Sequence, residues 1–315
     1  MDAKDYAILR ELDINFRQSF SSIGKKVKLS KNSVALRFEK LKDLMLHNVT
    51  GINNELIGQT MVKVYYSFDF YDEKTEKNII EYIKNNSNIM WAARMYGPYD
   101  LCIAIFIDDL HPLISEINRF NKKFSSKINQ KEMQIVYKQI FFRNNFIHNQ
   151  PVLQSYKLVK IDNKVILNDS ERKILKTIKY NPRMSIIEIA QKTNLTQKTA
   201  SNYLKKLQKL GVITGYFMTL NPIKFNLNTF KLMIQIQNLK DHKEFEAYLQ
   251  SIKNVRYVAK MLGLWDYEID LVYQNINDLQ AQIEMIKQRF PNVLKKISIL
   301  SMGNRLVTND NFFGL

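Results

Sequence analysis

The segment 185–211, SIIEIAQKTNLTQKTASNYLKKLQKLG, decides how the chain is interpreted. Its apolar residues recur at helical spacing in two short blocks, and a tight turn around Leu195 separates them. The first block starts at Ser185. Thr196 suits the start of the second, because its hydroxyl group can cap free backbone N–H groups. The pattern predicts two short helices joined by a turn, with Gly211 ending the second.

A further helix is expected just upstream of this segment. Ile174, Leu175 and Ile178 fall on one helical face, and Asp169 or Ser170 is expected to cap the start. Asn181-Pro182 ends it, because proline cannot continue a helix. Three short helices with a tight turn before the third are typical of the helix-turn-helix motif.

The third helix carries polar side chains opposite its apolar residues. In the region capped by Ser30, Val34, Phe38 and Leu41 are expected to point inward in the same way. Lysine and arginine neutralise phosphates or bond guanine, while asparagine and glutamine can bond adenine in the major groove. The predicted DNA-binding residues are Lys31, Asn32, Ser33, Arg37, Gln197, Lys198, Thr199, Asn202, Lys205 and Lys206, with Ser201 on the same face.

The chain contains an internal repeat with an offset of 166 residues. That offset aligns Ile8 with Ile174 and Arg17 with Arg183, and it returns downstream, where Gly97 aligns with Gly263. Identities that keep one register over two separate blocks indicate a tandem duplication, with copies of about 145 residues.

Each copy continues with alternating strand and helix patterns. In copy one these are MVKVYYSFDF, EKTEKNIIEYIKNN, IMWAARMY, DLCIAIFI, HPLISEINRFNKKF and MQIVYKQIFF, in the order βαββαβ of the ferredoxin-like motif. The predicted fold class is therefore α+β, with two copies of a winged helix-turn-helix domain followed by a ferredoxin-like sheet domain. The expected boundaries are 1–58 and 59–143 for copy one, 144–166 for a linker with some strand character, and 167–222 and 223–315 for copy two.

The third strand of each sheet predicts what the sheet packs against. LCIAIFI is apolar on both faces, although helices cover only one face of such a sheet. In copy two the matching face carries Asp266, Glu268 and Asp270. We expect the two sheets to pack face to face, with Arg94 or Lys63 pairing those acids, because a buried carboxylate needs a cationic partner. Solvent exposure of the acids is the alternative.

Composition favours a polyanionic partner. Lysine and arginine number 47 against 30 acidic residues, a formal net charge of +17. Residues 167–215 hold 10 basic and 3 acidic residues, whereas residues 1–59 hold 10 and 7, so copy two is expected to attract phosphates more strongly. No apolar run approaches a membrane span and the N-terminus does not resemble a signal peptide, so a cytoplasmic protein without membrane contact is expected.

Enzyme chemistry receives little support. The four histidines, 47, 111, 148 and 242, are scattered, and no HExxH, GxSxG or phosphate-loop motif occurs. Cys102, the single cysteine, excludes an intrachain disulfide and, in mid-strand, is expected to be a small buried apolar residue. We therefore expect no catalysis, no metal and no cofactor.

These motifs resemble the Lrp/AsnC family of transcriptional regulators over nearly the whole chain, twice. The similarity includes LSKNSVALRFEKL and LTQKTASNYLKKL, LGVITGY, and the Gly-x-x-Asp hairpins Gly97/Asp100 and Gly263/Asp266. The resemblance implies a sequence-specific regulator that binds double-stranded DNA. It also implies an oligomerising sheet domain that binds a small effector, often an amino acid, near those four hairpin residues.

The chain departs from the family pattern in carrying two unequal copies. Met45 stands where copy two has Gly211, and Tyr203 stands where copy one has Arg37, so we expect an asymmetric operator bound more strongly by copy two. Two linked copies act as a covalent pseudo-dimer, and further pairing of chains stays open. Sirohaem decarboxylases resemble the same architecture, but WAARMYGPYD and RYVAKMLGLWD lack the histidines expected there. A non-specific architectural DNA-binding protein is the third alternative.

Overall fold

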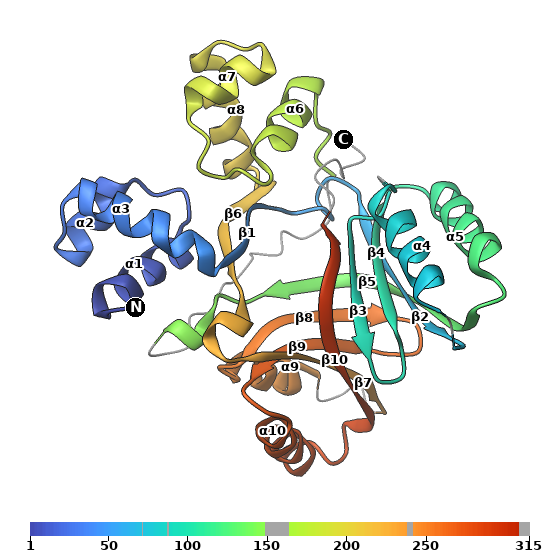
Figure 1. Cartoon of the computed structure of the whole chain (residues 1–315). Coiled ribbons are helices and arrows are strands. Elements are labelled where there is room, and N and C mark those ends of the chain that lie inside the picture. The colour runs from blue at the N-terminus through green and yellow to red at the C-terminus, as the bar shows by residue number, and fades with distance from the viewer. Residues whose placement is uncertain (71, 87, 149–163, 238–241, 309–315) are drawn as a thin grey trace. The chain divides into compact units, whose positions relative to one another are not determined.

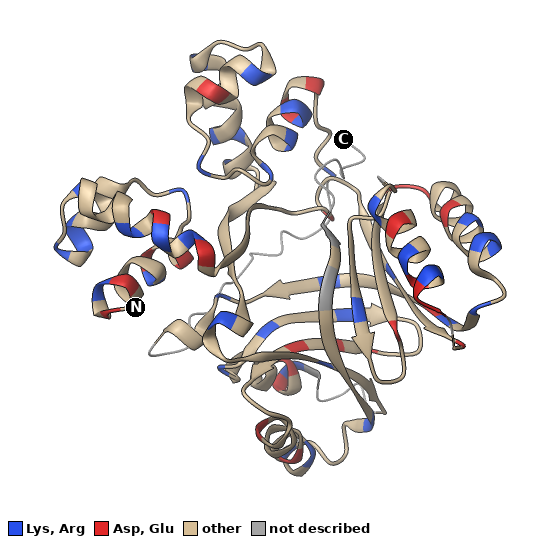
Figure 2. Ribbon diagram, viewed as in Figure 1, with Lys and Arg blue, Asp and Glu red and all other residues tan. Residues whose placement is uncertain are grey.

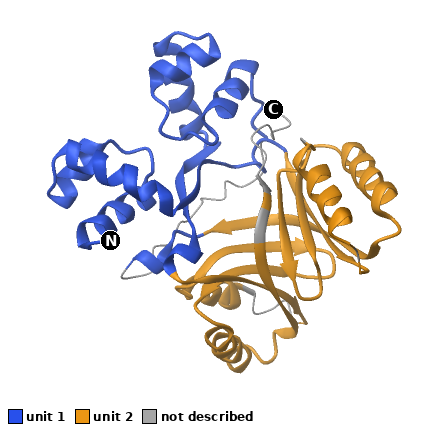
Figure 3. Cartoon of the chain, in the orientation of Figure 1, with its two compact units in different colours: residues 1–58, 142–225, 315 blue, residues 59–141, 226–314 orange. Residues whose placement is uncertain are grey.

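A computed structural model describes residues 1–70, 72–86, 88–148, 164–237 and 242–308 (Figure 1). Over these residues the chain divides into two compact units (Figure 3). Unit 1 comprises residues 1–58 and 142–225, and unit 2 comprises residues 59–141 and 226–308. Each unit therefore combines corresponding parts of both copies of the repeat. Most of the expected linker, residues 149–163, lies outside the described residues, as does its predicted strand character.

Unit 1 contains two three-helix modules. Serine or threonine caps the second and third helix of each, at Ser19, Ser30, Ser185 and Thr196. Of these caps, Ser30 and Thr196 were predicted. The cap of the first helix in copy two was predicted wrongly: Asn168 occupies that position, and Glu171 closes a capping box with it. The helices are α1 (Ala3–Ile14), α2 (Phe20–Val27), α3 (Lys31–Leu41), α6 (Asp169–Ile178), α7 (Ile186–Thr193) and α8 (Gln197–Lys209).

The turn before each third helix has the same backbone conformation in both modules. Lys28 ends α2 and Asn194 ends α7, and each has a φ of 56°, in the left-handed region. A single left-handed residue ends a helix abruptly and redirects the chain. The repeat thus preserves the turn that sets the third helix against the second.

The two modules share one core and one small sheet. After short 3-10 turn η1 (Lys42–Leu44), strand β1 (Met45–Ile52) pairs antiparallel with β6 (Ile213–Leu220) of the other copy, and Figure 1 shows the two strands side by side. The strand that follows each third helix therefore pairs across the repeat. Buried side chains from both modules form a single hydrophobic cluster. Its members include Leu9, Ile23, Phe38, Ile174, Ile189 and Leu207.

Unit 2 contains the order βαββαβ twice, as the sequence predicted. Its α+β character follows from period-two strands that alternate with amphipathic helices. The elements of copy one are β2 (Thr60–Phe68), α4 (Glu73–Lys84), β3 (Trp91–Tyr96), β4 (Leu101–Ile107), α5 (Leu110–Phe124) and β5 (Ile128–Phe141). Those of copy two are β7 (Asn228–Ile236), α9 (His242–Ser251), β8 (Val255–Leu262), β9 (Tyr267–Tyr273), α10 (Ile276–Arg289) and β10 (Leu294–Thr308).

The strands of both copies close into one barrel, in the order β10-β3-β4-β2-β5-β8-β9-β7. Face-to-face packing was expected, but the two sheets also pair along their edges, which that prediction did not include. The long last strand of each copy makes this connection: β5 pairs with β8, and β10 pairs with β3. On β4, Leu101, Ile103 and Ile105 pack on the helix side, while Cys102 and Ala104 join the cluster shared by both copies. Both faces of β4 are thus buried, as its apolar sequence predicted.

A network of buried charges links the two copies in unit 2. The Lys63 ammonium lies 2.7 Å from Glu268, as expected, and Glu268 also accepts hydrogen bonds from Lys231 and from the hydroxyl of Tyr65. Lys231 also pairs with Asp270. Burial acts to raise the pKa of Glu268, but Lys231 and Lys63 outweigh it and lower that pKa to about 2. The prediction that Arg94 pairs with these acidic residues was wrong.

Arg94 pairs instead with Glu76 of α4 at 2.6 Å. Its side chain is about one-third exposed, unlike that of Lys63. Helix α4 lies outside the barrel, so an arginine that reaches it cannot also reach the carboxylates inside.

Candidate nucleic-acid interface

The third helix of each module presents a polar outer face. On α3, Val34 and Phe38 are buried while Lys31 and Asn32 are exposed. On α8, Ala200, Leu204 and Leu207 are buried. The predicted residues that are exposed there are Gln197, Lys198, Asn202, Lys205 and Lys206. Basic positions occur along the helices of unit 1 (Figure 2), where a duplex would need them.

Two predicted contact residues belong to the helix caps. The hydroxyls of Ser33 and Ser30 lie 2.9 Å apart, and those of Thr199 and Thr196 lie 2.8 Å apart. Both Ser33 and Thr199 are partly exposed. Backbone N–H groups at the start of a helix also favour a phosphate. These hydroxyls therefore help to order the end of the helix that would approach DNA.

Arg37 forms ion pairs with two acidic residues at the start of the first helix of its own module. Its guanidinium donates to Asp5 at 2.6 Å and to Asp2 at 2.7 Å. The bonds to Asp5 and Asp2 raise the pKa of Arg37 above its ordinary value. Sequence reasoning missed these partners because they lie more than 30 residues away along the chain. In this structure Arg37 holds α3 against α1.

The lysines of α8 fall into two groups. Lys206 lies 2.7 Å from the buried carboxylate of Glu171, and that ion pair raises the pKa of Lys206. Over the described residues, Lys198 and Lys205 have no carboxylate within ion-pair distance. Lys198 and Lys205 are therefore the cations of this face that are most available to phosphates.

Leu36 lies on the outer face of α3 with 70% of its surface exposed. Leu36 was not among the predicted contact residues, all of which are polar. A large apolar side chain amid polar ones on such a face is a signal that could have identified it.

Reciprocal arginine contacts hold the two modules together. Arg17 donates to the carbonyl oxygen of Pro182, and Arg183 donates to that of Phe16 at 2.6 Å. The Arg183 guanidinium also lies 4.3 Å from the ring centre of Phe20, and burial lowers its pKa. Arg17 and Arg183 are equivalent residues of the repeat, so each copy donates a hydrogen bond to the other from the same position.

Strand β1 also donates hydrogen bonds to the C-terminal end of a helix in the opposite copy. The N–H and the hydroxyl of Thr50 donate to the carbonyl oxygens of Lys179 and Ile178, each at 2.7 Å. These acceptors lie at the end of α6, where carbonyl groups lack partners within the helix. The third helices of the two modules, α3 and α8, are thus part of one body held together by hydrogen bonds between the copies.

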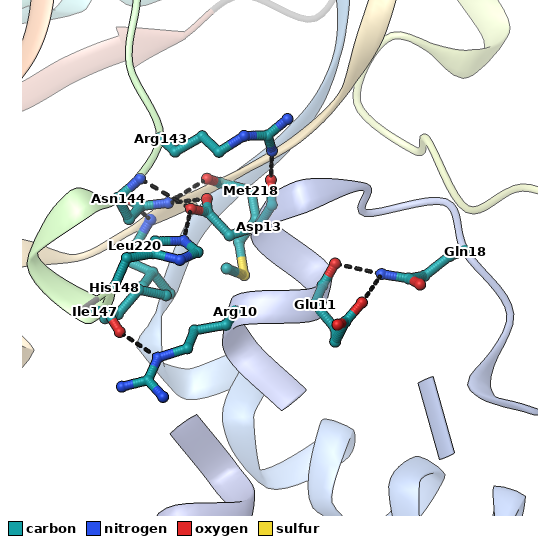
Figure 4. Close-up of polar contacts among 10 residues, drawn as sticks. All are labelled: Arg10, Glu11, Asp13, Gln18, Arg143, Asn144, Ile147, His148, Met218 and Leu220. Atoms are coloured by element: carbon teal, nitrogen blue, oxygen red, sulfur yellow. Dashed lines mark hydrogen bonds and ion pairs between the residues drawn. The ribbon is translucent and has the colours of Figure 1, made fainter. Parts of the chain in front are cut away.

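A third connection comes from residues 142–148, which include η2 (Asn145–Ile147) (Figure 4). The Asn144 amide donates to Asp13 of α1 at 2.6 Å and to the carbonyl oxygen of Met218 on β6 at 2.9 Å. His148 lies 2.7 Å from the same Asp13 carboxylate, and Arg143 donates to the Asp13 carbonyl oxygen. This buried polar cluster joins helix α1 of copy one to strand β6 of copy two.

In unit 2 the predicted effector residues lie at two equivalent hairpins. Gly97 and Gly263 have φ values of 129° and 149°, which favour glycine. Asp100 accepts a hydrogen bond from the N–H of Phe68, and Asp266 accepts one from the N–H of Ile236, both at 2.8 Å. A side chain at Gly97 would lie 2.9 Å from the carbonyl oxygen of Ile299, on the other copy. The hairpins are thus built between the copies.

The Cys102 thiol and possible metal ligands are further candidates for a site among the described residues. Burial raises the pKa of the Cys102 thiol to about 12, which keeps it protonated, in agreement with its expected role as a small buried residue. Among the described residues no three histidine, cysteine or acidic side chains are grouped as metal ligands. Where the structure is described, no helix is both long and apolar enough to span a bilayer.

The comparisons with known proteins follow the same division into copies. Residues 1–42 match the AsnC-type helix-turn-helix domain, and residues 167–214 match a winged helix-turn-helix DNA-binding model. An uncharacterised transcriptional regulator of Pyrococcus furiosus is 29% identical over 121 residues, which cover 38% of this chain and 81% of that protein. The regulator LrpC of Bacillus subtilis is 21% identical, over 40% of this chain and 85% of its own length.

The two helix-turn-helix matches and these relatives support a regulator of the Lrp/AsnC family. The match of each relative spans most of that relative but less than half of this chain, as expected if this chain carries two copies. The proline dehydrogenase transcriptional activator of Rhodobacter capsulatus shows the same relation, with 22% identity over 44% of this chain and 91% of its length.

The fold of the whole chain has a counterpart among solved structures. The crystal structure of the sirohaem decarboxylase NirDL superposes with a TM-score of 0.66, covering 96% of this chain and 92% of that one. Sequence identity is 11%, so the likeness concerns the fold alone.

Proposed function

We propose that this protein is a sequence-specific, DNA-binding transcriptional regulator of the Lrp/AsnC type. The observation that carries the proposal is the pair of third helices, α3 and α8, with exposed polar faces on one continuously bonded unit. Two helices held in this way can enter successive major-groove segments of one duplex. Linkage in one chain raises the effective concentration of the second helix once the first has bound.

The proposed contacts divide by chemistry. Lys31, Lys198 and Lys205 bind phosphates, which supply affinity without sequence information. Asn32, Gln197 and Asn202 bond base edges, for which adenine is the preferred partner. Ser33 and Thr199 order the N-termini of α3 and α8. Arg37 and Lys206 contact phosphates while they keep their ion pairs with Asp2, Asp5 and Glu171. Copy two, with fewer acidic residues, contributes the larger share of phosphate attraction.

Effector binding in unit 2 is a second part of the proposal. A small ligand such as an amino acid would bind beside Gly97, Asp100, Gly263 and Asp266. The support is the position of both hairpins at the junction of the copies, where a ligand would contact two chain segments at once. A panel of amino acids tested by thermal shift should raise the melting temperature for the effector, and a Gly97→Ala variant should lose that shift.

Selection of genomic fragments tests the regulatory function directly. The full chain is incubated with sheared genomic DNA at fixed salt, with and without the amino-acid panel, and bound fragments are sequenced. Enrichment of a short set of sites near promoters is expected. Recovery of random fragments would instead indicate the non-specific architectural protein.

Sirohaem decarboxylation is the second candidate, because the decarboxylase NirDL shares the fold over the full chain. Against it, the stretches WAARMYGPYD (91–100) and RYVAKMLGLWD (256–266) contain no histidine. Absorbance of the purified protein titrated with sirohaem separates the two functions. A stoichiometric spectral change followed by decarboxylated product would replace the regulator proposal.

A further inference from the structure

Leu36 occupies the centre of the outward face of α3. The buried residues Val34 and Phe38 lie two positions before and after it, which places Leu36 about 200° around the helix from each. It is 70% exposed, although it is a large apolar side chain. Nothing within its own module covers it, so whatever binds this face meets a leucine.

The internal repeat supplies a built-in comparison. The residue equivalent to Leu36 in α8 is Asn202, which is also exposed. At the neighbouring equivalent positions both helices remain polar: Lys31 corresponds to Gln197, and Asn32 to Lys198. The same fold therefore accepts a polar residue at this point, and packing within the module does not require the leucine.

The groove chemistry open to α3 is restricted by its neighbours. Arg37, the next residue, is bonded to Asp2 and Asp5 and is not free to bond guanine. Leu36 cannot donate or accept a hydrogen bond. In the major groove the apolar group that distinguishes one base from the others is the C5 methyl group of thymine.

We infer that Leu36 packs against the C5 methyl group of a thymine in the half-site bound by module one, while Asn202 bonds the N6 and N7 atoms of an adenine in the half-site bound by module two. The inference rests on the proposed DNA-binding function and adds the atoms that each helix reads. The two halves of the operator are then recognised through different chemical groups, even where both contain an A·T pair.

Single-atom changes in the duplex test this inference. In an operator obtained by selection, each thymine is replaced in turn by deoxyuridine, which lacks only the methyl group. One position in the module-one half should lose about fourfold in affinity, as expected for one buried methyl group. That loss should disappear in Leu36→Ala, because the shorter alanine side chain no longer reaches the methyl group of the thymine. Replacing adenines by 7-deazaadenine should weaken binding at one position of the module-two half that Asn202→Ala makes insensitive to the change.

Two controls separate the possible outcomes. Ile223 is 72% exposed, in η3 (Pro222–Phe225), so Ile223→Ala removes a similarly exposed apolar side chain outside the recognition helices and should retain the full deoxyuridine effect. Equal melting temperatures confirm that Leu36→Ala is folded. Equal affinity for every deoxyuridine operator, or a loss that persists in Leu36→Ala, overturns the role of Leu36 while leaving DNA binding intact. Failure of the wild-type chain to select any operator overturns the proposed function as well.

Discussion

Lys198 and Lys206 stand on the same face of α8 but in different electrostatic settings. Lys206 neutralises the buried carboxylate of Glu171, whereas Lys198 is exposed without such a partner among the described residues. Removing an ion pair's cation from a buried carboxylate destabilises a fold, whereas removing an exposed lysine changes stability little. The two residues therefore allow DNA binding and stability to be separated.

Lys198→Ala is expected to weaken binding to every duplex without changing the melting temperature. The slope of log affinity against log salt should fall by about 0.9, the value for one phosphate contact on duplex DNA. Lys206→Ala should lower the melting temperature. Lys253→Ala, which removes an exposed lysine of unit 2, is the matched control for both variants. An unchanged salt slope in Lys198→Ala would exclude that residue from the interface.

Residue patterns predicted the recognition helices because capping and helical periodicity depend on residues close together in the chain. The caps Ser30 and Thr196 were correct for that reason. The pairing of Arg37 with Asp2 and Asp5 was not predictable, since it depends on the packing of α3 against α1. Leu36 was not predicted, because an apolar side chain on an exposed helix face offers no hydrogen-bonding group that marks it as a DNA contact.

At the scale of elements, the barrel of unit 2 depends on charges that the two copies supply unequally. Glu268 of β9 contacts Lys63 of β2 and Lys231 of β7, and the residue equivalent to Glu268 in copy one is Cys102. Pairing a copy with itself would bring two glutamates, or none, to this place. The network therefore favours the pairing of unlike copies within one chain.

Glu268→Gln should destabilise the protein by about 3–5 kcal/mol, because it leaves the buried ammonium of Lys63 without its carboxylate and Lys231 with Asp270 alone. Urea unfolding measures the change. Glu284→Gln breaks an exposed pair with Lys287 and should cost less than about 1 kcal/mol. Similar losses for the two variants would show that the buried network adds nothing particular.

The same carboxylate predicts a dependence on pH. Because the folded-state pKa of Glu268 is lowered to about 2 from 4.5, its contribution to stability is complete above about pH 4.5 and is lost as the pH falls towards 2. Unfolding free energies of the wild type and Glu268→Gln, compared from pH 2 to pH 6, should converge at the acid end. A constant difference across that range would contradict the assigned pKa.

The order of elements was predictable, but their partners were not. Alternation and helical spacing revealed βαββαβ twice, whereas the pairings β5–β8, β10–β3 and β1–β6 connect segments from different copies. Such pairings depend on distant chain segments, and no local pattern specifies them. For this reason face-to-face packing was expected and barrel closure was not.

At the scale of the molecule, the bonded body of unit 1 sets the spacing of its two recognition helices. The shared core, the β1–β6 pair, and the contacts of Arg17 and Arg183 all oppose movement of one module against the other. A dimer of rigidly linked helix-turn-helix modules reads half-sites at one separation.

Inserting about 5 base pairs between the half-sites should therefore reduce affinity to that of a single module, because it rotates the second half-site by about half a helical turn. Fluorescence anisotropy with a series of insertions measures this. A Thr50→Val/Arg183→Ala variant, which loosens the connection, should show a weaker dependence on spacing. Equal binding at all spacings in the wild type would mean that the modules move independently.

The most direct test of DNA recognition by α3 and α8 is a competition experiment at one fixed salt concentration. Labelled operator is displaced by unlabelled operator or by random duplex, for the wild type and for the variant Lys31→Ala/Asn32→Ala/Lys198→Ala/Asn202→Ala. The wild type should discriminate by a factor of at least about 10³, and the variant should lose that discrimination while keeping its melting temperature. Equal discrimination in both proteins, or none in the wild type, would contradict the account.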